Sequence, residues 1–329
     1  MNLTTDADPV VHWAKSTAGI TYVFPIQRFV IAGMLDALAK KVDEDDDSKK
    51  GLIAVMPTGS GKTLCFQAAI ALDGRPALVL YPLLALLEDQ KRRFDELGIA
   101  AAVLRGGQSL QERNDLWAAV QCGKIKVVLS NPEAMLQAKT LEQAAKTGFA
   151  HLIVDESHCV CEWGKTFRPS YLQIPEIQRA ANILLLSAFT ATAGPEVLST
   201  IQQYLFPECS PYVISGNPDR PNMTLRVMGC VNKEATIRQI FFDQHPNNMI
   251  DTEEVYMWRP GTALPRPAIV FCSSRKACEI LCKILESDHP GKVLFYHAGL
   301  DREEKTRREK WFFDSSDGIL VSTTAYGIP

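Results

Sequence analysis

The fold of this chain is decided by the stretch Met56-Pro57-Thr58-Gly59-Ser60-Gly61-Lys62-Thr63. An apolar run, residues 51–55, precedes it and the sequence LCFQ follows, so the pattern predicts a strand, a glycine-rich loop and a helix start. Gly59 and Gly61 permit tight turns in which backbone N–H groups converge on a polyanion. Lys62 adds a positive charge for the β- and γ-phosphates, and the Thr63 hydroxyl is placed to ligate Mg²⁺. The stretch therefore predicts a nucleoside triphosphate site, although Met56 stands where the generic pattern has glycine.

A pair of acids further along the chain supplies the second half of such a site. The sequence HLIVDESH at 151–158 reads as an apolar strand that ends in Asp155 and Glu156. Asp155 is expected to hold Mg²⁺, and Glu156 is expected to orient and deprotonate the attacking water. A solvated loop is the alternative for an isolated acidic pair. Together with the upstream phosphate loop, the pair predicts an enzyme that hydrolyses a nucleoside triphosphate, with Lys62, Asp155 and Glu156 as its catalytic residues.

Composition limits the classes to which the chain can belong. Its 329 residues are 46% apolar, enough to bury one or two cores. A net charge of −3 excludes a global basic field, so a nucleic-acid site would have to be a local patch. The nine cysteines are scattered and odd in number, which favours a reduced intracellular protein. No apolar run is long enough for a membrane helix and no signal peptide is apparent, so we expect no membrane partner.

Strand and helix candidates alternate along the chain, as parallel sheets require. The strand candidates in the first half are 52–55, 77–81, 127–130, 152–154 and 183–187, and the helix candidates are 88–97, 114–121 and 141–147. Residues 207–221 and 244–267 are polar and rich in turn formers, which predicts irregular structure and a linker near residue 215. The alternation then restarts with strands 268–272, 293–296 and 318–322 and helices 275–286 and 302–313. We expect two α/β domains, residues 1–215 and 216–329, with the second incomplete at its C-terminus.

Several segments in a fixed order resemble the motifs of the RecQ family of superfamily 2 helicases. They are MPTGSGKTLCFQ (56–67), YPLLALLEDQ (81–90), SNPE (130–133), DESHCVCEWGKTFRPSY (155–171), FTATA (189–193), AIVFCSSR (268–275), YHAGL (296–300) and VSTTAYG (321–327). The resemblance implies two RecA-like P-loop NTPase domains, ATP and Mg²⁺ as cofactors, and ATP-dependent 3′-to-5′ separation of DNA strands. It implies a role in DNA repair or recombination, in the nucleus if the organism is eukaryotic. Within these motifs it assigns the coupling of hydrolysis to nucleic-acid binding to His158, Thr190 and Thr192.

An aromatic-rich segment directly follows the acidic pair. It contains Trp163, Phe167, Arg168 and Tyr171, and bases stacked on these rings would lie close to the hydrolysis site. Such contacts would let a bound strand gate hydrolysis. The alternative for each ring is a place in the core. Cys161-Glu162 and Lys165-Thr166 replace residues usual in the family, which puts the polar contacts made there in doubt.

Adenine recognition is implied upstream, in the sequence VFPIQ at 23–27. Gln27 matches the glutamine that reads the adenine edge in the family, and its alternative role is to cap the following helix. Phe24 stands where an arginine is usual, and its ring could stack on adenine instead. With the loop residues Thr58, Gly59, Ser60, Gly61, Lys62 and Thr63, these two residues complete the expected nucleotide contacts.

Two further expectations concern what the chain lacks. His158, Cys159 and Cys161 are too few for tetrahedral zinc, so no structural zinc is expected. The family continues beyond its fifth motif to arginines that reach the γ-phosphate, whereas this sequence ends at Ile328-Pro329, so we expect slow hydrolysis and poor unwinding. Two alternative functions therefore stay open: an ATP-gated nucleic-acid-binding protein with little hydrolysis, and an RNA helicase of the same superfamily.

Overall fold

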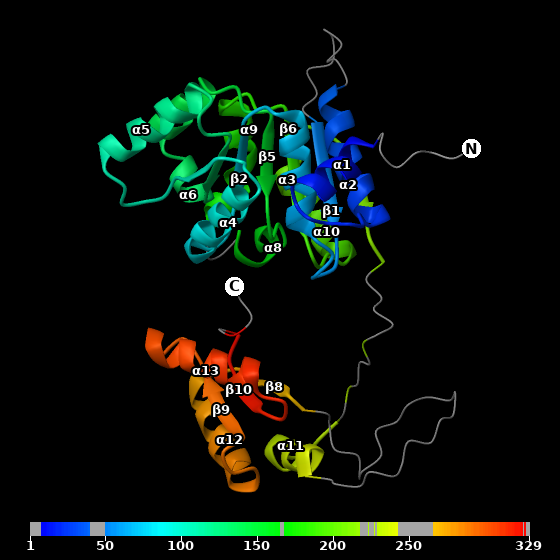
Figure 1. Ribbon diagram of the computed structural model, residues 1–329, viewed down its shortest axis with the longest axis vertical. Helices are drawn as coiled ribbons and strands as arrows, with labels where there is room; N and C mark the ends of the chain where they lie inside the picture. The colour runs from blue at the N-terminus through cyan, green and yellow to red at the C-terminus, as the bar shows by residue number, and fades with distance from the viewer. Residues whose placement is uncertain are drawn as a thin grey trace, which may run out of the picture. The chain divides into compact units, whose positions relative to one another are not determined.

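The computed structural model describes residues 8–39, 50–164, 168–217, 223, 227, 229–242, 266–324 and 326. The chain divides into two compact units, Met1–Arg220 and Pro221–Pro329 (Figure 1). Both are built from parallel strands joined through helices, which confirms the α/β class expected from the alternating pattern.

The first unit is built on a seven-stranded parallel sheet in the order β3-β4-β2-β5-β6-β1-β7. Its strands are β1 (Lys50–Val55), β2 (Ala77–Leu80), β3 (Ala101–Val103), β4 (Val127–Ser130), β5 (His151–Val154), β6 (Leu185–Thr190) and β7 (Tyr212–Ser215). Strands β2, β4, β5 and β6 are buried along their whole length, as apolar runs in a parallel sheet should be when both faces are covered.

Helices cover both faces of this sheet and enclose one hydrophobic core on each side (Figure 1). The first core is formed with α1 (Pro9–Ser16), α2 (Pro25–Ala39), α3 (Lys62–Asp73) and α4 (Leu84–Glu96). The second is formed with α5 (Leu110–Gln121), α6 (Pro132–Met135), α7 (Ala138–Ala145), α8 (Cys159–Trp163), α9 (Ile174–Ala180) and α10 (Pro195–Leu205), and the 3₁₀ helix η2 (Pro169–Gln173) lies between α8 and α9. Successive residues of β1 alternate between the cores, because strand side chains point to opposite faces.

The sheet order brings three loops together at one edge. Parallel strands end at the same edge, and β6 lies between β1 and β5. The backbone N–H of Met56, after β1, donates to the carbonyl oxygen of Thr190 at 2.9 Å, and that of Ser157, after β5, donates to the carbonyl oxygen of Phe189 at 2.8 Å. The phosphate loop and the acidic loop are therefore both bonded to the end of β6.

The polar stretch 207–221 is not wholly irregular, contrary to expectation. It contains β7, which pairs with β1 in the register Leu52↔Tyr212 to Val55↔Ser215. Three of the four β7 residues are exposed, because β7 is an edge strand with one neighbour. The segment therefore completes the first sheet.

The second unit contains a smaller parallel sheet in the order β8-β10-β9. Its elements are α11 (Lys233–Phe242), β8 (Ala268–Phe271), α12 (Arg275–Asp288), β9 (Val293–Tyr296), α13 (Arg302–Asp314) and β10 (Ile319–Ser322). Helix α12 packs on the sheet through Cys278, Leu281, Cys282 and Leu285, so both cysteines are core residues. Within the described parts of both units, no helix is long and apolar enough to cross a bilayer.

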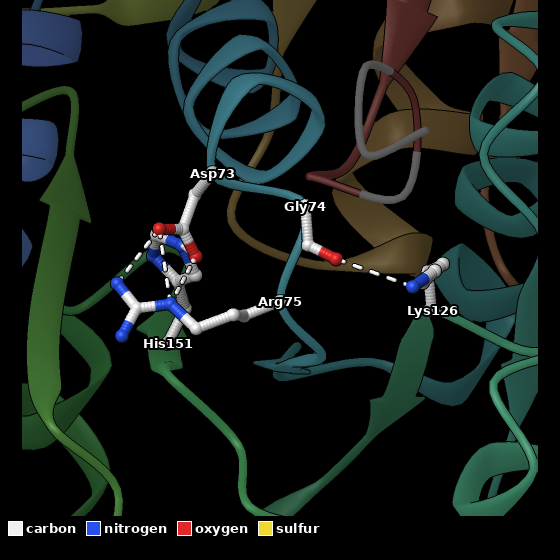
Figure 2. A network of polar contacts seen from close by, with 5 residues as sticks. All are labelled: Asp73, Gly74, Arg75, Lys126 and His151. Atoms are coloured by element: carbon white, nitrogen blue, oxygen red, sulfur yellow. Dashed lines mark hydrogen bonds and ion pairs between the residues drawn. The ribbon is translucent and has the colours of Figure 1, made fainter.

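A polar network lies at the opposite edge of the first sheet, where strands begin (Figure 2). Asp73, the last residue of α3, accepts hydrogen bonds from Arg75 at 2.7 Å and contacts Nε2 of the fully buried His151, which starts β5, at 3.2 Å. Lys126, before β4, donates to the carbonyl oxygen of Gly74 at 3.2 Å. Burial acts to raise the pKa of Asp73, but the hydrogen bonds and charges of His151 and Arg75 hold it well below its usual range.

Replacing Asp73 with asparagine should destabilise the first unit. The change removes the charge that Arg75 and His151 share, and we expect the free energy of unfolding to fall by about 1–3 kcal/mol at neutral pH. A carboxyl whose pKa is lowered on folding contributes stability above its unfolded pKa, about 3.9, and loses it as the pH falls through the folded pKa. The difference from wild type in urea unfolding should therefore shrink below about pH 4. The exposed Asp36→Asn is the control, and an equal loss in both variants would contradict the assignment.

Candidate active site

The phosphate loop has the backbone conformation that its glycines permit. Gly59 and Gly61 have φ of 79° and 78°, in the left-handed region that favours glycine. The loop closes on itself through Ser60, whose Oγ donates to the carbonyl oxygen of Pro57 at 2.6 Å. Helix α3 begins at Lys62 without a side-chain cap, so its first N–H groups and its dipole are available to an anion.

The two carboxylates follow β5 and interact with the loop lysine. Asp155 is 9% exposed, and its Oδ1 accepts a hydrogen bond from the backbone N–H of Glu156 at 3.0 Å. Burial and the charge of Glu156 raise the pKa of Asp155 to about 6, while the charge of Lys62 lowers it. Burial also acts to raise the pKa of Glu156, but its hydrogen bond with His158 and the charges of Lys62 and His158 lower it overall. The structure thus places Lys62 within electrostatic reach of both acids.

A chain of contacts links the acidic loop to the end of β6. Nδ1 of His158 lies 3.3 Å from Oε2 of Glu156 and 3.2 Å from Oγ1 of Thr190. The Thr190 hydroxyl donates to the carbonyl oxygen of Thr192 at 3.0 Å. Because Met56 donates to the backbone of Thr190, this chain of contacts also reaches the phosphate loop. The three residues expected to couple hydrolysis to strand binding therefore lie together beside Glu156.

Gln27, in the first turn of α2, connects the start of this helix to the phosphate loop. It is 4% exposed, its Oε1 accepts from the backbone N–H of Phe24 at 2.8 Å, and its Nε2 donates to the carbonyl oxygen of Ser60 at 2.8 Å. The first contact is the helix-capping alternative, since Gln27 is the third residue of α2. The second was not foreseen from the sequence. A Cβ at Gly61 would lie 2.4 Å from Nε2, so glycine is needed there for Gln27 to pack.

The residues at this edge have the chemistry that Mg²⁺ requires. Thr63 is the second residue of α3, and Asp155 directly follows β5, the strand on the other side of β6 from β1. A hydroxyl and a carboxylate are the oxygen ligands found with nucleotide-bound Mg²⁺. The donor set at this edge therefore fits the metal.

The aromatic-rich segment is described only in part. Trp163 ends α8, but its side chain and all of Phe167 lie outside the described residues. The guanidinium of Arg168 forms two hydrogen bonds with the carboxylate of Glu133, at 2.8 and 2.9 Å, and donates to the carbonyl oxygen of Pro82. Arg168 is therefore hydrogen-bonded to residues of two other motif-like segments, 81–90 and 130–133. Sequence reasoning missed these partners, although both lie in segments that carry the resemblance.

Tyr171 does not present its ring to solvent, so the prediction that it stacks on bases is wrong for this structure. The residue is 1% exposed and packs in the second core with Val160 and Ile174. The guanidinium carbon Cζ of Arg168 lies over the Tyr171 ring, 5.3 Å from the ring centroid. For each aromatic residue of this segment the sequence left open a place in the core, and Tyr171 lies in the core.

Replacing Tyr171 with leucine should therefore lower stability before it affects nucleic-acid binding. We expect the free energy of unfolding to fall by about 1–3 kcal/mol, because leucine does not fill the space that the tyrosine ring occupies in the core. Urea unfolding measures this loss, and Tyr22→Leu, at a residue 62% exposed, is the matched control. Unchanged stability together with weaker binding of single-stranded DNA would show instead that the ring contacts bases.

Comparison with known proteins identifies relatives for most of the chain. A family model described as DEAD/DEAH box helicase matches residues 25–200. The chain is 28% identical over 294 residues to the ATP-dependent DNA helicase hus2/rqh1 of Schizosaccharomyces pombe, covering 85% of this chain and 21% of the relative. It is 29% identical over 284 residues to the probable ATP-dependent DNA helicase RecS of Bacillus subtilis, covering 85% and 53%. These relatives confirm the RecQ resemblance, and the chain spans only part of their length.

Solved structures share the fold. The DUF1998 helicase MrfA bound to DNA has a TM-score of 0.63 at 18% identity, covering 100% of this chain and 46% of that one. Dbp5 of S. cerevisiae bound to RNA and ADP BeF₃ has a TM-score of 0.61 at 16% identity, covering 97% and 74%. At these identities the likeness supports the helicase-type α/β architecture.

Proposed function

Because the chain belongs to the DEAD/DEAH box helicase family, we propose that it is the ATP-hydrolysing part of a RecQ-like DNA helicase that separates strands in the 3′-to-5′ direction. The observation that carries the proposal is the meeting of the Lys62 loop with Asp155 and Glu156 at the end of β6. The curated relatives named above are DNA helicases.

Each residue at this edge has a proposed task in hydrolysis. The backbone of Thr58–Thr63 and the charge of Lys62 bind the triphosphate. Mg²⁺, held by Thr63 and Asp155, would neutralise charge on the phosphates. Glu156 accepts a proton from the attacking water, and its lowered pKa keeps it ionised for this task at neutral pH. His158, Thr190 and Thr192 pass changes at Glu156 to the neighbouring loop.

DNA is the proposed partner, supported by the DNA helicases among the relatives. Trp163 and Phe167 are the proposed stacking residues. Arg168, engaged by Glu133 and the Pro82 carbonyl, is proposed to hold the start of η2 against the motifs after β2 and β4 rather than to bind phosphate itself. An intracellular location, nuclear in a eukaryote, belongs to the same proposal.

Steady-state hydrolysis with and without nucleic acid tests this function. Whatever its rate, ATP turnover is expected to be stimulated by single-stranded DNA more than by RNA of the same sequence, and any unwinding is expected to require a 3′ overhang and not a 5′ overhang. ATP binding without turnover would favour the ATP-gated binding protein instead. Stimulation by RNA alone would favour the RNA helicase.

A further inference from the structure

The proposed metal ligand Asp155 has an aromatic residue on each side of it in the sheet. Strand β5 pairs with β2 on one side and with β6 on the other, in registers that hold to its last residue, Val154. One residue further along, the same registers bring Tyr81, Asp155 and Phe189 into one row at the carboxyl edge of the sheet. The backbone N–H of Asp155 donates to the carbonyl oxygen of Leu80 at 3.0 Å, which keeps β2 and β5 in step at this point.

The three side chains of this row lie on the same face of the sheet. Tyr81 and Phe189 are 1% and 0% exposed and belong to the first core. Asp155 follows Ile153 by two residues, and Ile153 lies in that core, so strand alternation directs the carboxylate to the same face. Burial raises the pKa of Tyr81 well above its usual range, and the charge of Asp155 raises it further. The phenol and the carboxylate are therefore within electrostatic reach of each other.

Both rings are held by the helices that cover this face. The Tyr81 hydroxyl donates to Oε1 of Gln90, a buried residue of α4, at 3.3 Å. Because an unpaired buried hydroxyl is costly, this hydrogen bond permits a tyrosine ring to lie beside Asp155. The ring of Phe189 meets that of Phe66, on α3, edge to face with centroids 5.3 Å apart. Asp155 is therefore bordered by fixed apolar surface on both sides.

We infer that Tyr81 is a positioning residue for Mg²⁺: its ring keeps water from the β2 side of Asp155, and the carboxylate consequently binds the metal more tightly. The inference rests on the proposed function, because it requires Mg²⁺ at Asp155. Fewer water molecules around a carboxylate lower the local dielectric constant, which strengthens its attraction for a cation. The apolar shell around a metal site controls solvent access and local dielectric in this way.

Calorimetric titration with the non-hydrolysable nucleotide AMPPNP, first with Mg²⁺ and then in EDTA, tests the inference. The ratio of the two dissociation constants gives the affinity that the metal adds, and it does not depend on turnover. We expect Tyr81→Ala to reduce this ratio by about tenfold, as is typical when the shell around a metal is altered. Affinity in EDTA should stay at the wild-type value. Tyr81→Phe keeps the ring and should keep the ratio.

Two further variants guard against a general loosening of the core. Tyr81→Leu fills part of the space and should reduce the ratio by about threefold, so it serves if Tyr81→Ala does not fold. Phe149→Leu is the matched control, because Phe149 is 1% exposed in the second core and lies two residues before β5, at the edge where strands begin. It should lower stability and leave the ratio unchanged.

The outcomes distinguish the inference from the function beneath it. If AMPPNP does not bind the wild-type chain, or binds equally well in EDTA, the proposed Mg²⁺ and ATP site itself is refuted. If the metal strengthens binding in the wild type and the folded Tyr81 variants all keep the wild-type ratio, the inference is overturned. Equal weakening of AMPPNP with and without Mg²⁺ would also overturn it, because the ring would then support the nucleotide site as a whole.

Discussion

Glu156→Gln is expected to lower the rate of ATP hydrolysis by about 10²- to 10⁴-fold, the range for loss of a general base. Glutamine keeps the shape of the side chain but cannot accept the proton of the attacking water. The backbone at this position is unusual, because Glu156 has φ of 50°, a left-handed conformation that is strained for a residue with a Cβ. The turn presents the carboxylate beside His158, 3.3 Å away, at the carboxyl edge of the sheet.

The same variant should still bind nucleotide. Lys62, the loop backbone and Asp155 are unchanged, and loss of one negative charge near the triphosphate can only favour binding. Single-turnover hydrolysis with enzyme in excess measures the rate, and calorimetry measures the affinity. Glu142→Gln, on the exposed surface of α7, is the control and should hydrolyse like wild type. Hydrolysis by Glu156→Gln within tenfold of wild type would exclude Glu156 as the base.

Most buried strands of the first sheet were recognised because buried parallel strands appear in a sequence as apolar runs, but β6, which carries Thr190, was predicted at 183–187 and spans Leu185–Thr190. Strand β4 has the predicted bounds, and β2 and β5 differ from prediction by one residue at one end. Strand β3, with the sequence Ala-Ala-Val, was missed because three residues without a clear pattern carry little signal. Strand β7 was missed because an exposed edge strand lacks the apolar run of a central one.

Side-chain orientation was harder to predict than element type. An aromatic residue beside an acidic motif can face solvent or the core, and sequence spacing does not decide between them. Tyr171 faces the core, because η2 turns it toward α8 and α9. Gln27 has the same ambiguity: its contact with Phe24 is the capping alternative, whereas its contact with Ser60 becomes visible only when α2 and the phosphate loop are seen side by side. Both cases depend on contacts between segments that are separate in the sequence.

Lys62→Ala should lower ATP turnover by about 10²- to 10³-fold, as expected when one preorganised charge is removed from a phosphoryl-transfer site. Unlike Glu156→Gln, it should also weaken binding, because the lysine attracts the β- and γ-phosphates before reaction begins. Its loss has a second effect. The charge of Lys62 lowers the pKa of both Asp155 and Glu156, so each pKa should rise in the variant. A larger fraction of both acids would then be protonated at a given pH.

This second effect predicts how the residual activity depends on pH. A protonated Glu156 cannot act as a base, so the rate of the Lys62→Ala variant should fall at a higher pH than the wild-type rate as acid is added. Lys62→Arg restores the positive charge, and with it the wild-type pH profile, but not the full rate, since a planar guanidinium does not fit the place of a compact ammonium. Lys139→Ala, exposed on α7, is the control. If Lys62→Ala loses rate but keeps the wild-type pH profile, Lys62 acts on the triphosphate alone, and the electrostatic link from the loop to the two carboxylates is refuted.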